Sequence, residues 1–375
     1  MSDWFGKEVF KLGFGLMRLP KQEDGKTIDV EQVSKMVDLF LEAGGTYFDT
    51  AYVYDNGESE AAIRKALVDR HPRESYTLCT KLNAWLGNPD EAAAKQQFQT
   101  SLERTGAGYF DYYLLHALQR NNYQIYDKYH LWDFVKEQKE KGLIKYWGFS
   151  FHDDPEFLEQ LLNEHPDVDF IQLQINYADW ENPDVASRAC WEVARRHNVS
   201  VTVMEPVKGG ALANPIPEVQ EVFKKADPKL SCASWAIRYA ASLEGIITVL
   251  SGMSDIKQME DNLSYMRNFK PLTSAEQQVI ADAIAAMESV DTIKCTACHY
   301  CTENCPKQIP IPEIFAVRNQ QMMLNQGEGA KFGYNRATSE KGKASDCIQC
   351  GQCEGACPQH LGIIGYLQEC AANLE

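Results

Sequence analysis

Short apolar runs alternate with longer amphipathic stretches from about Leu12 to Met253. Apolar runs of about four to eight residues predict buried strands, and apolar positions three and four residues apart predict helices. The expected strands are Leu12–Leu19, Tyr47–Ala51, Tyr76–Lys81, Tyr109–His116, Ile144–Phe151, Phe170–Ile175, Val199–Met204 and Ile247–Leu250. The expected helices between them include Val30–Ala43, Glu91–Thr105, Asp154–Asn163 and Pro183–His197.

Eight strands that alternate with helices over about 250 residues predict an α/β fold, the (β/α)₈ or TIM barrel. The alternative is an open doubly wound sheet, which favours a glycine-rich phosphate-binding turn after its first strand. Gly13-Phe14-Gly15 lacks the third glycine of that turn, and Arg18 and Pro20 follow where a helix would begin. The barrel is therefore the preferred interpretation.

The pattern changes after Asn262. Ser274–Ser289 has the pattern of a closing helix, with Ser274 as its expected N-cap and Glu276 in its first turn. Strand signals are few beyond Cys295, and Pro312–Leu324 is helix-like. We therefore predict a barrel domain over residues 1–289 and a small, mainly helical domain over residues 290–375.

Charge and composition narrow the class of protein. The 375-residue chain has 53 acidic and 37 basic residues, a net charge of −16. This charge argues against nucleic acid or an anionic membrane as a partner, because both attract basic patches. The N-terminus lacks the pattern of a secretory signal, and no run reaches the roughly 18 apolar residues of a membrane span. We expect a cytoplasmic protein, and the 12 cysteines of a cytosolic chain favour metal or cluster ligands over disulfides.

Eight of the cysteines form two copies of the pattern C-x2-C-x2-C-x3-C-P. The copies contain Cys295, Cys298, Cys301 and Cys305, and then Cys347, Cys350, Cys353 and Cys357. Each residue of the second copy lies 52 positions after its counterpart, as Cys347 does after Cys295. Zinc sites usually use separated C-x2-C pairs and four ligands, so these runs favour iron–sulfur clusters over zinc.

The tail therefore resembles two-cluster ferredoxins, in which the fourth cysteine of each run ligates the other cluster. The resemblance implies two [4Fe–4S] clusters. One would be held by Cys295, Cys298, Cys301 and Cys357, and the other by Cys347, Cys350, Cys353 and Cys305. The long stretch between the runs indicates the helical type of such domains. We expect the other cysteines to be packing residues: Cys79, Cys190, Cys232 and Cys370.

Four polar residues follow or end neighbouring expected strands. Asp49, Lys81 and His116 lie at the ends of the second, third and fourth strands, and Tyr54 lies in the loop after the second. Each residue alone has an ordinary structural explanation, such as a cap or a satisfied core histidine. Barrel enzymes, however, place their chemistry at the C-terminal ends of the strands. Together the four residues therefore predict an active site.

This half of the chain resembles the aldo-keto reductase family over about residues 8–270. The matching segments are Gly13-Phe-Gly15, Phe48-Asp-Thr-Ala-Tyr-Val-Tyr54, Asn56-Gly-Glu-Ser-Glu60, Lys81, His116, Gly148-Phe-Ser150, Gln174 and Gly252-Met253. With its tail, the chain is similar to the branch that carries a C-terminal ferredoxin domain. The resemblance implies hydride transfer between NAD(P)H and a small carbonyl or alcohol substrate. Tyr54 would be the proton donor. Lys81, held in place by Asp49, would lower the pKa of Tyr54, and His116 would orient the carbonyl group.

The resemblance also implies the cofactor contacts. Ser150, Gln174 and Met204 match positions around the nicotinamide. The contacts expected after the eighth strand are Gly252, Met253, Ser254, Gln258 and Asn262. Phe151 and Met204 replace the family's common Asn and aromatic residue, and Gly252 and Gln258 occupy the positions that usually carry cations. We therefore expect NADPH to have little or no binding advantage over NADH.

The combined pattern predicts an iron–sulfur oxidoreductase whose barrel transfers hydride and whose clusters transfer electrons, with a redox protein as a candidate partner. In a second hypothesis the barrel is mainly a docking scaffold and the clusters carry the activity. A third, in which the clusters are structural staples, ranks lower. A hydride carries two electrons, whereas each cluster passes one electron at a time. A flavin could link the two kinds of transfer, and the sequence shows no flavin fingerprint.

Overall fold

The computed structural model describes residues 9–85, 88–183, 185–303 and 305–375. Its contacts divide the chain into two compact units. The first unit comprises Met1–Lys208 with Ala233–Gln277, and the second comprises Gly209–Cys232 with Gln278–Glu375. The expected boundary between residues 289 and 290 falls inside the second unit, and it remains a prediction about which segments fold together.

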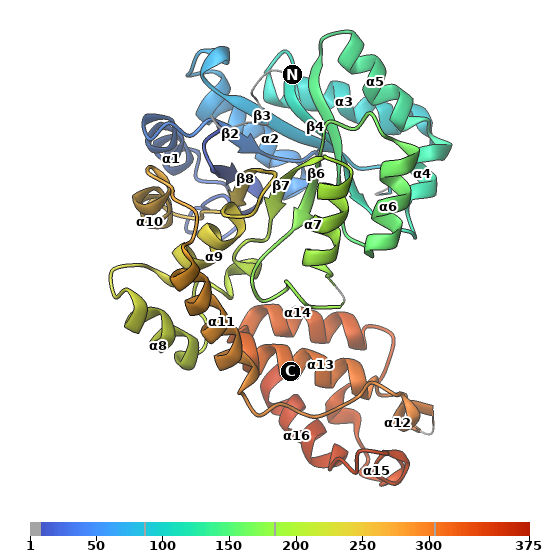
Figure 1. The fold of residues 1–375 in the computed structure, drawn as a ribbon. Coiled ribbons are helices and arrows are strands. Elements are labelled where there is room, and N and C mark those ends of the chain that lie inside the picture. Colours follow the sequence, from blue (N-terminus) through green and yellow to red (C-terminus); the bar gives the residue numbers. More distant parts are fainter. Residues whose placement is uncertain (1–8, 86–87, 184, 304) are drawn as a thin grey trace. The chain divides into compact units, whose positions relative to one another are not determined.

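The described residues of the first unit form a closed barrel of eight parallel strands, β1 to β8 in chain order (Figure 1). This confirms the predicted TIM barrel. The strands are β1 Leu12–Gly15, β2 Tyr47–Asp49, β3 Thr77–Leu82, β4 Phe110–Leu118, β5 Ile144–Phe151, β6 Phe170–Gln174, β7 Ser200–Met204 and β8 Ile246–Ser251. β1 is shorter than expected because Leu16–Arg18 turns into a 3₁₀ helix. Parallel strands with helical crossovers are buried on both faces, which explains their nearly continuous apolar sequences.

Helices surround the strands in this unit. They are α1 Val30–Glu42, α2 Glu58–Ile63, α3 Glu91–Thr105, α4 Tyr123–Lys128, α5 Leu131–Glu140, α6 Pro155–Glu164, α7 Ser187–Arg196, α9 Cys232–Ala241 and α10 Ile256–Met266. Aspartates start several of them: Asp29, Asp90 and Asp154 each accept a hydrogen bond from a backbone N–H of the first turn. α7 starts later than predicted, because Ala186 has a left-handed backbone (φ 49°).

The barrel interior is filled by side chains. Every second strand residue points inward, and Tyr47, Cys79, Tyr112 and Phe170 pack there. At Gly148 a Cβ atom would lie 1.9 Å from the carbonyl oxygen of Phe170, so this position requires glycine. The opposite strand faces pack against the helices and form the larger hydrophobic core.

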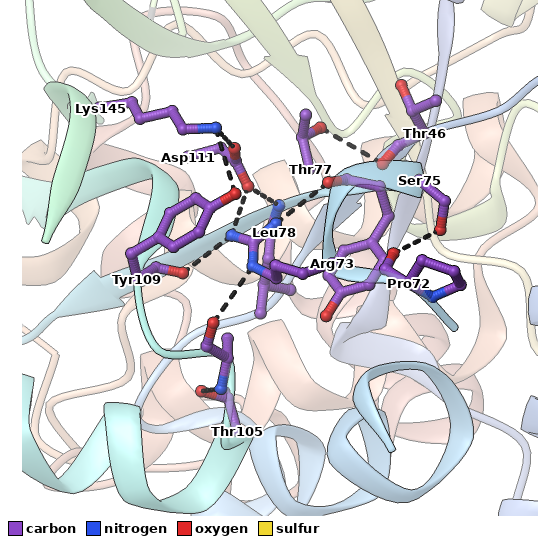
Figure 2. Close-up of polar contacts among 12 residues, drawn as sticks. Thr46, Pro72, Arg73, Ser75, Thr77, Leu78, Thr105, Tyr109, Asp111 and Lys145 are labelled. Atoms are coloured by element: carbon purple, nitrogen blue, oxygen red, sulfur yellow. Dashed lines mark hydrogen bonds and ion pairs between the residues drawn. The ribbon is translucent and has the colours of Figure 1, made fainter. Parts of the chain in front are cut away.

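A polar group closes the N-terminal end of the strands β3 to β5 (Figure 2). Asp111 in β4 is 1% exposed, and its carboxylate accepts hydrogen bonds from the Leu78 N–H at 3.0 Å and the Lys145 ammonium at 2.8 Å. The Arg73 guanidinium donates to the same carboxylate at 2.7 Å and to the Tyr109 carbonyl oxygen at 2.8 Å. These contacts tie three strands together at the end opposite the predicted active site.

The second unit is helical in its described residues, as predicted. Its helices are α8 Pro217–Ala226, α12 Tyr300–Glu303, α13 Ile311–Leu324, α14 Gly327–Thr338, α15 Gln352–Ala356 and α16 Ile363–Leu374. α13, α14 and α16 pack on one another (Figure 1), and Ile314, Phe315, Tyr334 and Leu367 lie in their core. Among the described residues no helix has the length and apolar composition needed to cross a membrane.

α11, Ser274–Glu288, contains the division between the two units. The prediction that Ser274 caps it is wrong by one residue. The Glu276 N–H donates to the Thr273 Oγ1 at 3.3 Å, and the Thr273 N–H donates to the Glu276 carboxylate at 2.8 Å. The reciprocal pair is a capping box, so Thr273 is the N-cap and Ser274 is the first helical residue.

The sequence repeat of the second unit is also a structural repeat. α13 begins at Ile311 and α16 at Ile363, which are 52 positions apart. Left-handed backbone conformations recur at the same interval: Ala297 with Gln349, His299 with Gly351, and Gln308 with His360. The two cysteine runs therefore have matching backbone paths.

Candidate functional site

The four residues expected at the barrel mouth come together at the C-terminal ends of β2, β3 and β4. Lys81 is completely buried, and its ammonium lies 2.5 Å from the Asp49 carboxylate and 2.6 Å from the Thr50 carbonyl oxygen. Gln172 donates to the other Asp49 oxygen at 3.3 Å. A buried ion pair is stable only if other hydrogen bonds compensate for the lost hydration of its charges. The Thr50 carbonyl oxygen and the Gln172 amide provide such hydrogen bonds here.

Tyr54 and His116 complete this group. The Tyr54 ring centre lies 4.9 Å from the Lys81 ammonium and 5.8 Å from the His116 ring centre. Tyr54 begins a short 3₁₀ turn in which Asp55 has a left-handed backbone (φ 49°). The Asp55 carboxylate pairs with Lys21 at 2.8 Å. The Lys21–Asp55 pair thus anchors the turn that carries Tyr54.

Burial sets the protonation states of this group. It raises the pKa of Tyr54; the Lys81 charge opposes this effect, yet the pKa stays above its ordinary value. The expected lowering of the Tyr54 pKa is therefore not found, because the loss of hydration exceeds the attraction of the cation. Burial lowers the pKa of Lys81, but Asp49, Tyr54 and Cys79 outweigh it and raise the pKa above its usual value.

His116 is neutral. Burial, together with the charges of Lys81 and His152, lowers the pKa of His116 well below its ordinary value. Its Nδ1 is buried and has no hydrogen-bond partner among the described residues. A neutral imidazole next to a fixed cation can donate or accept one hydrogen bond without changing its charge.

The residues expected around the nicotinamide lie at the ends of β5, β6 and β7. The Ser150 Oγ is buried and accepts a hydrogen bond from the Ala117 N–H at 2.7 Å. The Gln174 amide donates to the Asp179 carboxylate at 2.8 Å, and Met204 pairs with Gln174 across the two strands. Phe151, where the family commonly has Asn, packs in the outer hydrophobic core and therefore faces away from the barrel axis.

A polar network at the ends of β6 and β7 was missed by the sequence reasoning. Asp179 is completely buried, and its carboxylate accepts from the Asn176 amide at 2.8 Å and contacts the Lys208 ammonium. Asn176 also donates to the Glu205 carbonyl oxygen at 3.1 Å. The segment Asn176-Tyr-Ala-Asp179 carries a local signal, because the Asp179 N–H donates to the Asn176 Oδ1 three residues before it, a local side chain–backbone contact that Asn commonly makes.

A cavity of about 220 Å³ adjoins this network. Its lining includes Gln119, His152, Asp153 and Gln174. These side chains place amide, imidazole and carboxylate groups in the cavity, at the C-terminal ends of β4, β5 and β6. Gln174 is thus placed where it can contact both the cavity and the Asp179 network.

The segment after β8 is held by its own side chains. The Ser254 N–H donates to the Gln258 Oε1 at 2.8 Å, and the Ser254 hydroxyl donates to the Arg18 carbonyl oxygen at 2.9 Å. Asn262 is buried and donates to the Ser251 hydroxyl at 2.7 Å. Met253 is 1% exposed and belongs to the hydrophobic core. Asn262 and Met253 therefore hold this loop rather than present themselves at the surface.

Arg18 is a cation that the sequence reasoning did not place here. A Cβ atom at Gly252 would lie 3.5 Å from both the Cβ and the Cδ of Arg18. The arginine stem therefore runs beside the position where the family usually carries a cationic side chain. Arg18 comes from the turn after β1, so no local pattern around Gly252 could have indicated it.

The eight cysteines of the second unit surround two separate cavities. We call these the first cysteine site, lined by Cys295, Cys298, Cys301 and Cys357, and the second cysteine site, lined by Cys305, Cys347, Cys350 and Cys353. Each cavity is therefore lined by three cysteines of one run and the fourth cysteine of the other. The crossed ligand sets implied by the ferredoxin resemblance fit this arrangement.

The remaining lining of both sites is mostly apolar. Burial raises the pKa of Cys301 to about 11, so its thiolate would need a metal ion or cluster to be stable. Among the described residues, no three His, Cys, Asp or Glu side chains are arranged so that they could hold a single metal ion. Of the other cysteines, Cys79, Cys190 and Cys370 are buried and Cys232 is half-buried, in agreement with packing roles.

Comparisons with known proteins agree with both units. Residues 11–285 match the aldo/keto reductase family, and residues 294–361 match a 4Fe-4S dicluster domain. The uncharacterized oxidoreductase YqkF of Bacillus subtilis is 24% identical over 301 residues, which cover 72% of this chain and 90% of that protein.

Two solved structures are similar to this chain in fold. Aldo-keto reductase AKR11C1 from Bacillus halodurans, in its holo form, is 26% identical with a TM-score of 0.57, over 73% of this chain and 91% of that chain. An aldo-keto reductase from Klebsiella pneumoniae in complex with NADPH shares the fold at 18% identity and a TM-score of 0.58, over 72% of this chain and 90% of that chain.

Proposed function

The chain belongs to the aldo/keto reductase family of NAD(P)-dependent oxidoreductases, and from this premise we propose that its barrel reduces the carbonyl group of a small molecule or oxidises the corresponding alcohol. With its 4Fe-4S dicluster domain the protein is an iron–sulfur oxidoreductase. The observation that carries the proposal is the buried Lys81–Asp49 pair beside Tyr54 and a neutral His116.

Each of these side chains has a separate role in the proposed reaction. When bound, the reduced nicotinamide supplies a hydride to the carbonyl carbon. The carbonyl oxygen then needs one proton, and the Tyr54 hydroxyl donates it. Because burial keeps the Tyr54 pKa high, the phenol is protonated and ready at neutral pH. The Lys81 charge stabilises the tyrosinate that remains until solvent returns the proton.

Asp49 and His116 act on position and charge. Asp49 holds the Lys81 ammonium at 2.5 Å from its carboxylate, with the Tyr54 ring centre 4.9 Å from the ammonium. His116 is neutral, so its N–H can donate a hydrogen bond to the substrate oxygen without releasing a proton. Ser150 and Gln174 would bind the nicotinamide carboxamide, for which Ser150 must release or share its contact with the Ala117 N–H.

The second unit would add single-electron transfer. An iron–sulfur cluster supplies one electron at a time, and the two cysteine sites would hold one [4Fe–4S] cluster each. We infer that these clusters exchange electrons with a redox protein partner, and that the enzyme works in the cytoplasm. Cys298 and Cys350 are the exposed cysteines of the two sites, which supports access from outside.

The experiment that tests the barrel chemistry is Tyr54→Phe. The change removes one hydroxyl and keeps the ring, so the fold is preserved while the proton donor is lost. General acid catalysis contributes about 10²–10⁴-fold, so we expect kcat/KM for carbonyl reduction to fall at least about a hundredfold. The iron–sulfur absorption of the variant should match that of the wild type.

Tyr52→Phe is the matched control, because Tyr52 lies in the same loop and its ring contacts Arg104 instead of Lys81. This variant should keep near wild-type activity. Full carbonyl-reducing activity in Tyr54→Phe would remove Tyr54 from the mechanism and favour the barrel as a docking scaffold.

A further inference from the structure

The orientation of the Gln174 side-chain amide is decided by its partner. The Gln174 Nε2 donates a hydrogen bond to the Asp179 Oδ2 at 2.8 Å. An ionised carboxylate can only accept hydrogen bonds, so the amide nitrogen must face Asp179 and the amide oxygen is turned away from it. Gln174 is half-buried, and among the described residues no group donates to its Oε1. The oxygen is therefore the atom that Gln174 can offer to a ligand.

Asp179 is itself held in one position. It is completely buried, and its Oδ2 accepts a second hydrogen bond from the Asn176 Nδ2 at 2.8 Å. Its backbone N–H donates to the Asn176 Oδ1 at 2.9 Å, and its Oδ1 contacts the Lys208 ammonium. A buried carboxylate requires a cation and hydrogen-bond donors around it, and these contacts supply both. The atom that Asp179 presents to Gln174 is thus fixed.

The Gln174 side chain faces the barrel axis at the mouth. Residues two positions apart in a strand point to the same face of the sheet. Gln172, two positions before Gln174 in β6, donates across the barrel interior to Asp49 of β2. Gln174 is the last residue of β6 and shares that face. Because Phe151 packs in the outer core, Ser150 and Gln174 are the polar residues that remain for the nicotinamide carboxamide.

These two residues are complementary to one orientation of a carboxamide. The Ser150 Oγ accepts from the Ala117 N–H, so its own O–H remains to donate to the carboxamide oxygen. The Gln174 Oε1 can only accept, and the carboxamide NH2 group can only donate. Resting on the proposed function, we propose that Asp179 is a positioning residue. It fixes the Gln174 amide so that the amide oxygen accepts a hydrogen bond from the NH2 group of the nicotinamide carboxamide.

Asp179→Asn should reverse the orientation of Gln174. The Lys208 ammonium attracts the oxygen of the new amide, so the nitrogen of that amide takes the place of the Asp179 Oδ2. Gln174 must then turn its oxygen toward this nitrogen and present its own NH2 group to the ligand. The variant also loses the acceptor of the Asn176 Nδ2, so its free energy of unfolding is measured separately.

The test compares the binding of two dinucleotides to the anaerobically prepared full chain by titration calorimetry. One is NAD, and the other is 3-acetylpyridine adenine dinucleotide, in which a methyl group replaces the carboxamide NH2. The oxidised forms are used because they deliver no electrons to the clusters. The wild type should bind NAD about two- to tenfold more tightly, the range of one neutral hydrogen bond, relative to the ratio in Gln174→Leu, which lacks the acceptor. Asp179→Asn should lower the preference to that of Gln174→Leu.

The double variant separates a positioning role from a general structural one. If Asp179 acts through Gln174, Asp179→Asn causes no further change of preference in the Gln174→Leu background. Asp111→Asn is the matched control, because Asp111 is also a buried, ion-paired aspartate but lies at the opposite strand ends. It should lower the free energy of unfolding and leave the preference between the two dinucleotides unchanged.

The inference is overturned if the wild type has the same preference as Gln174→Leu, a comparison that holds even where Asp179→Asn does not fold. It is also overturned if Asp179→Asn keeps the wild-type preference, or if its effect persists in the Gln174→Leu background. Failure of the proposed function is distinct. A wild type that binds neither dinucleotide contradicts the nicotinamide chemistry of the barrel and this inference with it, whereas binding without the preference contradicts only the role of Asp179.

Discussion

At the scale of single residues, desolvation and cations from distant parts of the sequence set the charges at the barrel mouth. Lys81 is buried and paired, so its charge is fixed, yet it does not overcome the effect of burial on the pKa of Tyr54. Arg18 likewise acts on a position far away in the sequence, because its stem lies beside Gly252. Absence of a side chain at Gly252 leaves the space that this arginine fills.

The Arg18 position changes the expectation for the cofactor. A charge-assisted contact to a phosphate contributes about 1.5–3 kcal/mol. We expect Arg18→Gln to weaken NADPH binding at least about tenfold, and NADH binding less, because NADH lacks the 2′-phosphate. Binding of the two cofactors is measured by fluorescence titration, with Lys35→Gln on α1 as a control. An equal loss for both cofactors would show that Arg18 does not contact the 2′-phosphate.

At the scale of elements, the barrel keeps function and stability at opposite strand ends. The C-terminal ends of β2 to β4 carry Asp49, Lys81 and His116, whereas the N-terminal end of β4 carries Asp111 with its two cations (Figure 2). The Asp111 carboxylate also accepts a hydrogen bond from the Leu78 N–H of β3, so the same side chain contacts a neighbouring strand and two cations. Its contacts serve the fold and not the proposed reaction.

We therefore expect Asp111→Ala to destabilise the barrel strongly. It removes the acceptor of the buried Leu78 N–H and of the Arg73 guanidinium, and leaving a buried donor unsatisfied costs about 1–3 kcal/mol. Denaturant unfolding followed by tryptophan fluorescence measures the free energy of unfolding. Lys35→Ala, which removes an exposed pair with Glu31, is the comparison and should change it little. Similar stabilities for the two variants would contradict the role given to Asp111.

At the scale of the whole molecule, the chain combines one unit built for hydride transfer with one built on a repeated cysteine run. The residues of the proposed barrel site all belong to the first unit, and the eight cysteines belong to the second. Each cavity takes its fourth cysteine from the other run, so neither run completes a site alone.

From the two cavities we expect about eight iron and eight sulfide per chain after anaerobic preparation. Cys305→Ser should alter the signal of the second site, which contains Cys347, while the signal of the first site persists. Chemical iron and sulfide analysis and paramagnetic resonance measure both. Four irons, or stoichiometric zinc, would contradict two clusters, and loss of only the first-site signal in Cys305→Ser would contradict the crossed ligand sets.

The sequence by itself determined the features that repeat locally. Strand β5 was expected at Ile144–Phe151 and is found there, because a buried parallel strand has a continuous apolar run. The 52-residue repeat indicated two similar cysteine runs, and the strand-end positions of Asp49, Lys81 and His116 indicated one barrel mouth. Periodicity and topology are enough for such features, because they depend on neighbours in the chain.

Only the tertiary structure decided the features that depend on distance and burial. The stem of Arg18 beside Gly252 and the contact of Lys208 with Asp179 join segments that no local pattern connects. The pKa of Tyr54 rises because its hydroxyl loses hydration, an effect that the presence of Lys81 in the sequence could not reveal. Desolvation and long-range contacts arise from packing, and packing exists only in the folded chain.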